Sequence, residues 1–230
     1  MKSFNQYLKE MIQEGVNDPG IFKAFFTAGG PGSGKSYVAG RSGMGSGKFM
    51  SPYGLKIIDS DPLFKYLLRQ AGMAATEKDI WSEKGQETRE RAKALTKRRQ
   101  AGYLEGRLGL LIDGTGKDYT KIKKMSDALR KVGYDTYMLF VNTSLDVAIQ
   151  RDAARDRTLG PEEVEKMWKP VQANMGKFQS YFGRENFILI DNNSANDKLF
   201  DMLFVQIGKL INEPPSSRAA SAWIKSQRSR

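Results

Sequence analysis

The chain alternates between short, strongly apolar runs and longer segments in which apolar residues recur at helical spacing. Five apolar runs predict buried strands, because they are short and lack the polar alternation of a half-exposed strand. They cover 21–27, 55–58, 108–112, 134–141 and 187–190. Helical patterns fill most of 62–107 and cover 117–131, 144–157, a segment from 161 onward and 199–211. This order predicts an α/β fold with a five-stranded parallel sheet, helices on both faces and right-handed crossovers.

The two ends of the chain differ from this central part. Residues 1–15 predict an amphipathic helix, which either packs on its own domain or anchors a protein partner. Its apolar stripe consists of Phe4, Tyr7, Leu8, Met11 and Ile12. Residues 213–230 are basic, and we expect a flexible tail in which Trp223 and Ile224 are available for docking. The sequence therefore predicts an N-terminal helix (1–18), a central domain (19–212) and a C-terminal tail (213–230).

A glycine-rich loop follows the first predicted strand, and a helix is expected to begin after it. Its sequence matches the pattern G-x-x-x-x-G-K-[ST] at every fixed position. Glycines let backbone N–H groups close around phosphate oxygens, and the helix N-terminus adds a positive dipole. Lys35 would reach the β- and γ-phosphates, and the Ser36 hydroxyl would ligate Mg²⁺. The expected nucleotide-binding residues are Gly29, Gly30, Pro31, Gly32, Ser33, Gly34, Lys35, Ser36 and Tyr37.

A second glycine-rich stretch at 40–54 resembles this loop only superficially. Ser42 stands where the first glycine belongs, and Phe49 replaces the hydroxyl residue after Lys48. No apolar strand precedes it. We therefore expect a flexible loop, with the alternative that Lys48 folds over the phosphates.

Composition limits the chemistry that this chain performs. It has no cysteine and no histidine, which excludes disulfides, thiol nucleophiles and histidine-based acid–base catalysis. Proton transfer must then fall to Asp, Glu, Lys or Tyr. The formal charge of +11 suits a nucleic-acid or other polyanionic partner, and equally an enzyme that handles phosphates. No apolar run approaches the ~18 residues of a membrane span, and no signal-peptide core is present, so we expect a cytoplasmic protein.

Carboxylates follow the second and third predicted strands, where ligands of open parallel sheets bind. Asp59 and Asp61 follow the strand at 55–58, and each is either a catalytic base or a cap for the helix that opens at Pro62. Asp61 is well placed for the cap. Asp113 follows the strand at 108–112 in a Walker B-like pattern and would orient Mg²⁺, with the hydroxyl of Thr115 at the same edge.

Two further groups of polar residues come later in the chain. Arg151, Arg155 and Arg157 end a predicted helix, where they either compensate its dipole or form a mobile lid over the transferring phosphate. Asn192 lies in the turn after the last strand, a region where such folds often hold the purine base. The helix from 161 is expected to contribute core residues and to kink or break at Pro170.

Taken together, these motifs resemble the P-loop kinases of the zeta-toxin and polynucleotide-kinase type. The resemblance rests on the glycine loop, Ile-Asp-Ser-Asp at 58–61, Ile-Asp-Gly-Thr-Gly at 112–116 and Arg-Asp-Ala-Ala-Arg-Asp-Arg at 151–157, and covers 21–211. It implies a three-layer kinase domain with strand order 2-3-1-4-5. It also implies that Asp61 deprotonates the acceptor and that Asp113 and Thr115 belong to the turn after the third strand. Some of the three arginines at 151–157 would be the lid arginines of the family. The style of the chain is also similar to phage-encoded kinases, which would place it in a host cytoplasm or on a virion.

The resulting hypothesis is an ATP- and Mg²⁺-dependent kinase. It would transfer the γ-phosphoryl group to a hydroxyl of an anionic acceptor: a nucleotide, a nucleotide-sugar or a nucleic acid 5′ end. The insert at 40–54, the terminal extensions and the shifted Pro62-Leu63-Phe64-Lys65 depart from the family pattern and leave the acceptor open. The alternative is a nucleotide-binding assembly component that docks through its N-terminal helix and basic tail.

Overall fold

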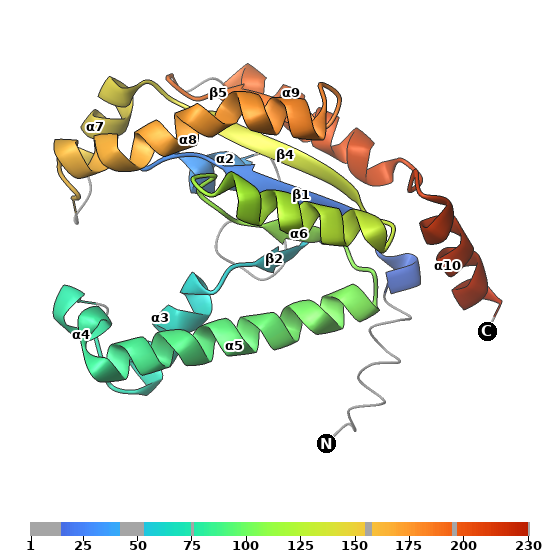
Figure 1. Cartoon of the computed structure of the whole chain (residues 1–230), viewed down its shortest axis with the longest axis horizontal. Coiled ribbons are helices and arrows are strands. Elements are labelled where there is room, and N and C mark those ends of the chain that lie inside the picture. The colour runs from blue at the N-terminus through green and yellow to red at the C-terminus, as the bar shows by residue number, and fades with distance from the viewer. Residues whose placement is uncertain (1–14, 42–52, 75, 155–157, 195–196, 230) are drawn as a thin grey trace.

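The computed structural model describes residues 15–41, 53–74, 76–154, 158–194 and 197–229 (Figure 1). The expectations for the N-terminal helix, for Lys48, and for Arg155 and Arg157 fall outside these residues. The strands are β1 (Lys23–Ala28), β2 (Lys56–Ile58), β3 (Leu110–Ile112), β4 (Asp135–Asn142) and β5 (Phe187–Asp191). The helices are α2 (Lys35–Arg41), α3 (Asp61–Gln70), α4 (Glu77–Trp81), α5 (Glu83–Glu105), α6 (Tyr119–Lys131), α7 (Leu145–Ala153), α8 (Pro161–Phe182), α9 (Asp197–Asn212) and α10 (Arg218–Arg228).

The five strands form one parallel sheet in the order β2-β3-β1-β4-β5. Both the number of strands and their order confirm the sequence prediction. Every strand therefore ends at the same edge of the sheet, and the loops that follow the strands gather there.

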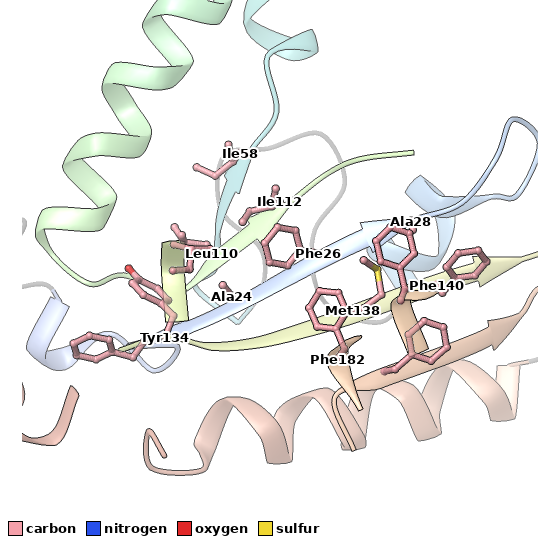
Figure 2. Packing of buried hydrophobic residues seen from close by; sticks show 14 of the residues in the cluster. Ala24, Phe26, Ala28, Ile58, Leu110, Ile112, Tyr134, Met138, Phe140 and Phe182 are labelled. Carbon is pink, nitrogen blue, oxygen red and sulfur yellow. The ribbon is translucent and has the colours of Figure 1, made fainter. Parts of the chain in front are cut away.

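Side chains alternate between the two faces of the sheet because the strand repeat is two residues. On β1, Ala24, Phe26 and Ala28 join a core cluster with residues of α6 and α8. Phe25 points the other way, into a cluster with residues of α2 and α9. Figure 2 shows Phe26 beside Phe182 of α8 on the first face, and their ring centroids are 5.9 Å apart. Helices thus bury both faces, which accounts for the almost uninterrupted apolar character of β1.

Helices α3, α4 and α5 form an arm beside the β2 edge of the sheet (Figure 1). A small cluster of Leu63, Phe64, Leu68 and Ala92 joins α3 to α5. The guanidinium of Arg89 stacks over the ring of Phe64, 4.6 Å from its centroid. The arm therefore has its own apolar packing, which joins α3 to α5, a helix of 23 residues.

Two expectations about the C-terminal half need correction. Of the kink or break expected at Pro170, the break is wrong, because α8 continues through this residue. The tail, for which the sequence predicts flexibility, contains α10, in which Trp223 packs edge-to-face on Phe22 with ring centroids 5.5 Å apart. Apolar contacts to the start of β1 thus outweigh the polar composition of the tail. Among the described helices, none has the length and apolar character that a membrane crossing requires.

Candidate functional site

Strand register brings polar residues at the carboxyl ends of β1, β2 and β3 into one row. Ile112 of β3 pairs with Ile58 on one side and with Phe26 on the other. The next residue on β3, Asp113, accepts a hydrogen bond of 2.5 Å from the Thr27 hydroxyl. The same hydroxyl accepts a bond of 3.3 Å from the N–H of residue 114. Asp113 is therefore fixed beside the loop that leaves β1.

The glycine loop connects β1 to α2, as predicted, and tight packing accounts for several of its glycines. The N–H of Gly29 donates to the carbonyl of Thr115, 3.0 Å away. Gly32 and Gly34 have φ angles of 68° and 77°, which favour glycine strongly. A β-carbon on Gly32 would overlap the carbonyl oxygen of Ala148. Close packing and positive φ angles thus require glycine at these positions of the loop.

Asn192 supports this loop from the end of β5. Its side chain is only 3% exposed, and its amide donates a 2.7 Å hydrogen bond to the carbonyl of Ser33. A β-carbon on Gly34 would overlap the same amide nitrogen. A place for Asn192 near the purine base stays a prediction, and in the structure its buried side chain supports the backbone of the glycine loop.

The two charged residues of the loop and of β3 face each other. The ammonium of Lys35 lies 3.1 Å and 3.3 Å from the two carboxylate oxygens of Asp113. Ser36 is exposed beside it at the start of α2. Among the described residues, no group of three or more acidic side chains is placed to hold a metal ion. The Asp113 carboxylate and the Ser36 hydroxyl are oxygen ligands of the kind that Mg²⁺ prefers, and this ion usually arrives with phosphate ligands and retains several waters.

The structure distinguishes Asp59 from Asp61. Asp59 is half-buried in a cavity that it shares with Asp113, whereas Asp61 is exposed and opens α3. Asp59 accepts a 2.9 Å hydrogen bond from the backbone N–H of Asp61. The N-cap position of α3 is Ser60, and no side chain caps this helix, so neither aspartate has the capping role that the sequence allows. Burial raises the pKa of the Asp59 carboxyl, and repulsion from Asp61 and Asp113 adds to this against the lowering effect of the hydrogen bond and of Lys35.

Arg151 is the one predicted lid arginine within the described residues. It is half-buried, and its guanidinium reaches the carbonyl of Gly32 at 3.5 Å. The carboxylate of Asp152, next to it, accepts hydrogen bonds from the N–H groups of Leu159 and Gly160 at 2.7 and 3.2 Å. Arg151 is thus held against the loop, and Asp152 ties the end of α7 to the residues just before α8.

Two cavities meet at the carboxyl edge of the sheet. The first, of about 520 Å³, is lined by residues 29–37 together with Thr115, Lys117 and Met167. The second, of about 410 Å³, contains Asp59 and Asp113 and shares Thr115 and Lys117 with the first. We call them the donor cavity and the acceptor cleft. Both volumes fall in the range of small-molecule sites.

Sequence reasoning misses several residues around these cavities. The apolar stripe of the helix from 161 predicts core positions for Met167 and Trp168, yet Met167 lines the donor cavity and Trp168 packs beside Gly30. The indole N–H of Trp168 donates to the carbonyl of Thr143 at 2.9 Å. No motif singles out Lys117. Its position two residues after Thr115 is nevertheless a usable signal, because that turn is expected at the ligand-binding edge.

Comparison with protein families gives a match that covers most of the chain. A family model described as Zeta toxin matches residues 10–198, which includes all five strands and the glycine loop. No curated protein sequence matches the chain.

Solved structures with a similar fold share little sequence with the chain. A chain of the AvrRxo1-ORF1:AvrRxo1-ORF2 structure with sulphate ions is 11% identical, covers 96% of this chain and 84% of its own, and has a TM-score of 0.52. A gluconokinase from Sinorhizobium meliloti is 15% identical over 83% and 94% of the two chains, with a TM-score of 0.47. The PezAT toxin-antitoxin system of Streptococcus pneumoniae gives 14%, 99% and 95%, with a TM-score of 0.44. At such identities only the fold is compared, and only the first score is high enough to support it.

Proposed function

Because the chain belongs to the zeta toxin family of P-loop kinases, we propose that it transfers the γ-phosphoryl group of ATP to a hydroxyl of an anionic acceptor. The observation that carries this proposal is the adjacency of the two cavities. The phosphate-binding loop lines one, and a half-buried carboxylate lines the other, with Thr115 and Lys117 between them. A donor and an acceptor bound in them would meet at that junction.

The donor half uses the loop amides and two charged side chains. The N–H groups around Gly32 and Gly34 would bind the β- and γ-phosphate oxygens, and Lys35 would turn from Asp113 to the same phosphates. Ser36 and Asp113 would hold the Mg²⁺ that accompanies ATP and neutralises its phosphate charge. Arg151, already beside the loop, would add a fixed positive charge at the transferring group.

The acceptor half needs a group that receives a proton. The acceptor oxygen attacks the γ-phosphorus, the bond to the bridging oxygen breaks, and ADP leaves with that electron pair. We assign the hydroxyl proton to Asp59, because Asp59 lines the acceptor cleft and Asp61 does not. The family pattern favours Asp61, so the two carboxylates give opposite expectations for mutation.

The test is transfer of labelled γ-phosphate from ATP to a panel of UDP-sugars, nucleosides, nucleotides and 5′-hydroxyl oligonucleotides. With the acceptor that works, we expect Asp59→Asn to lower kcat by roughly 10²–10⁴, the usual contribution of general base catalysis. Asp61→Asn should lower it by less than ten-fold. The reverse order would return the role to Asp61. Absence of transfer to every member of the panel, with ATP bound, would count against a kinase with this acceptor class.

A protein partner that binds through residues 1–15 and a location in a host cytoplasm stay predictions. Both are best approached after the activity is known, since the acceptor restricts where such an enzyme acts.

A further inference from the structure

The walls of the acceptor cleft carry an unexplained surplus of lysines. Lys93 and Lys97 come from α5, and Lys117 and Lys121 come from the loop before α6 and from α6 itself. The two pairs of lysines therefore line one cavity but come from different parts of the chain. Nothing in the proposed chemistry of ATP requires lysines from α5.

Most of these lysines lack an acidic partner among the described residues. Lys93 pairs with Glu90 on the same helix at 2.7 Å. Within the part of the chain that the structure describes, no ion pair joins Lys97, Lys117 or Lys121 to a carboxylate. Asp118 also lines the cleft, but its carboxylate accepts the backbone N–H of Lys121 and caps α6. The cleft is lined by four lysines and by the three carboxylates Asp59, Asp113 and Asp118, so its lining has a net positive charge, which favours an anion.

Position separates the roles of the lysines. Lys117 lines both cavities, and therefore belongs to the junction where the phosphoryl group moves. Lys97 and Lys121 line the acceptor cleft but not the donor cavity, and they come from α5 and α6 respectively. Beside them lie Ile122 and Met125, which form an apolar surface in the same cavity. The cleft thus offers a carboxylate at the strand ends, an apolar strip, and a pair of cations on the helices.

We infer that Lys97 and Lys121 form a two-sided clamp for a second, non-reacting phosphate on the acceptor. The acceptor is then a compact phosphate ester with its reacting hydroxyl at Asp59 and its phosphate between α5 and α6. The volume of about 410 Å³ suits a sugar phosphate or a nucleoside monophosphate better than a long polymer. This inference rests on the proposed function, because it assumes that the cleft holds the acceptor.

The test compares a molecule with and without its phosphate. Ribose 5-phosphate and ribose are titrated calorimetrically into protein saturated with Mg²⁺ and a non-hydrolysable ATP analogue, so that the donor cavity is filled. The clamp variant is Lys97→Gln with Lys121→Gln. The control is Arg98→Gln with Lys124→Gln, which removes the same charge from exposed positions on the same two helices outside the cleft.

We expect the phosphate ester to bind and ribose not to, with affinity reduced ten-fold or more in the clamp variant and less than two-fold in the control. This size follows from the loss of two charge-assisted hydrogen bonds. Equal losses in both variants would mean that only net charge matters, and equal binding of ribose and its phosphate would mean that no clamp exists. Either result overturns the inference. The kinase activity is tested separately by transfer of labelled phosphate from ATP. If the clamp does not exist, the wild-type protein still transfers the label to its acceptor, so the two failures can be told apart.

Discussion

The side-chain amide of Asn192 donates a 2.7 Å hydrogen bond to the backbone carbonyl of Ser33, in the middle of the phosphate-binding loop. The two residues are 159 positions apart, and the bond is buried. The backbone of Asn192 is itself tied to β4 through a 2.9 Å bond from its N–H to the carbonyl of Asn142. The last strand of the sheet therefore helps to fix the shape of a loop that belongs to the first.

Replacing Asn192 tests this support. Asn192→Ala removes a neutral hydrogen bond worth about 0.5–1.5 kcal/mol, so we expect ATP to bind roughly 2- to 10-fold more weakly. Asn192→Asp should be worse, because a carboxylate cannot donate to the Ser33 carbonyl and lies beside the phosphates. Calorimetric titration with ATP measures both. Asn212→Ala, which removes an exposed amide at the end of α9, is the control and should leave ATP affinity unchanged. Equal affinity in all three variants would contradict a positioning role.

Two glycine replacements separate loop geometry from general backbone effects. Gly34 has a φ of 77°, and a β-carbon added there would overlap the amide of Asn192, so Gly34→Ala should strain the loop and weaken ATP binding at least ten-fold. Gly176 lies in α8, where a β-carbon would have no atom within 4 Å. Gly176→Ala should therefore raise the free energy of unfolding by about 0.5–1 kcal/mol and leave ATP binding unchanged. Urea unfolding and ATP titration of both variants give the comparison.

The donor site is largely predictable from sequence, and the reason is local. The loop pattern specifies both its glycines and its ligand, and apolar runs mark the strands that end beside it. Asn192 illustrates the limit. Its place in a polar turn after the last strand is visible in the sequence, but whether its side chain faces ligand or loop depends on how β5 packs, which no local pattern encodes.

The acceptor side and the tail are less predictable for related reasons. Choosing between Asp59 and Asp61 requires knowing that β2 ends at Ile58 and α3 begins at Asp61, and such boundaries are uncertain by a few residues when only the sequence is known. A polar and basic composition predicts a flexible tail. Trp223 finds its partner Phe22 near the opposite end of the chain, so the contact that orders α10 is a tertiary one.

The raised pKa of Asp59 predicts a cost in stability. Burial makes its charged form less favourable in the folded protein than in the unfolded chain, so the cost is present above the folded-state pKa and disappears as pH falls through it. In EDTA and without nucleotide, Asp59→Asn should therefore have a higher melting temperature than the wild type at pH 7 to 8. The difference should shrink under acidic conditions.

Asp201→Asn is the control for this measurement, since it removes the same charge from an exposed position on α9. It should change the melting temperature little at either pH. If Asp59→Asn lowers the melting temperature at neutral pH, the carboxylate of Asp59 stabilises the fold, and the stability cost inferred from its burial is wrong.

The packing of α10 is also open to direct measurement. Trp223 contacts Phe22 edge-to-face and lies under the guanidinium of Arg107, 5.9 Å from its ring centroid. Trp223→Ala should lower the free energy of unfolding by about 2 kcal/mol, less than the ~3–5 kcal/mol of fully buried tryptophans because Trp223 is partly exposed. Lys225→Ala, on the exposed side of the same helix, should change it by less than about 0.5 kcal/mol. ATP affinity should be unaffected in both variants, because α10 packs where β1 begins and the loop lies where β1 ends. Equal unfolding curves for the two variants would show that α10 does not contribute to the fold.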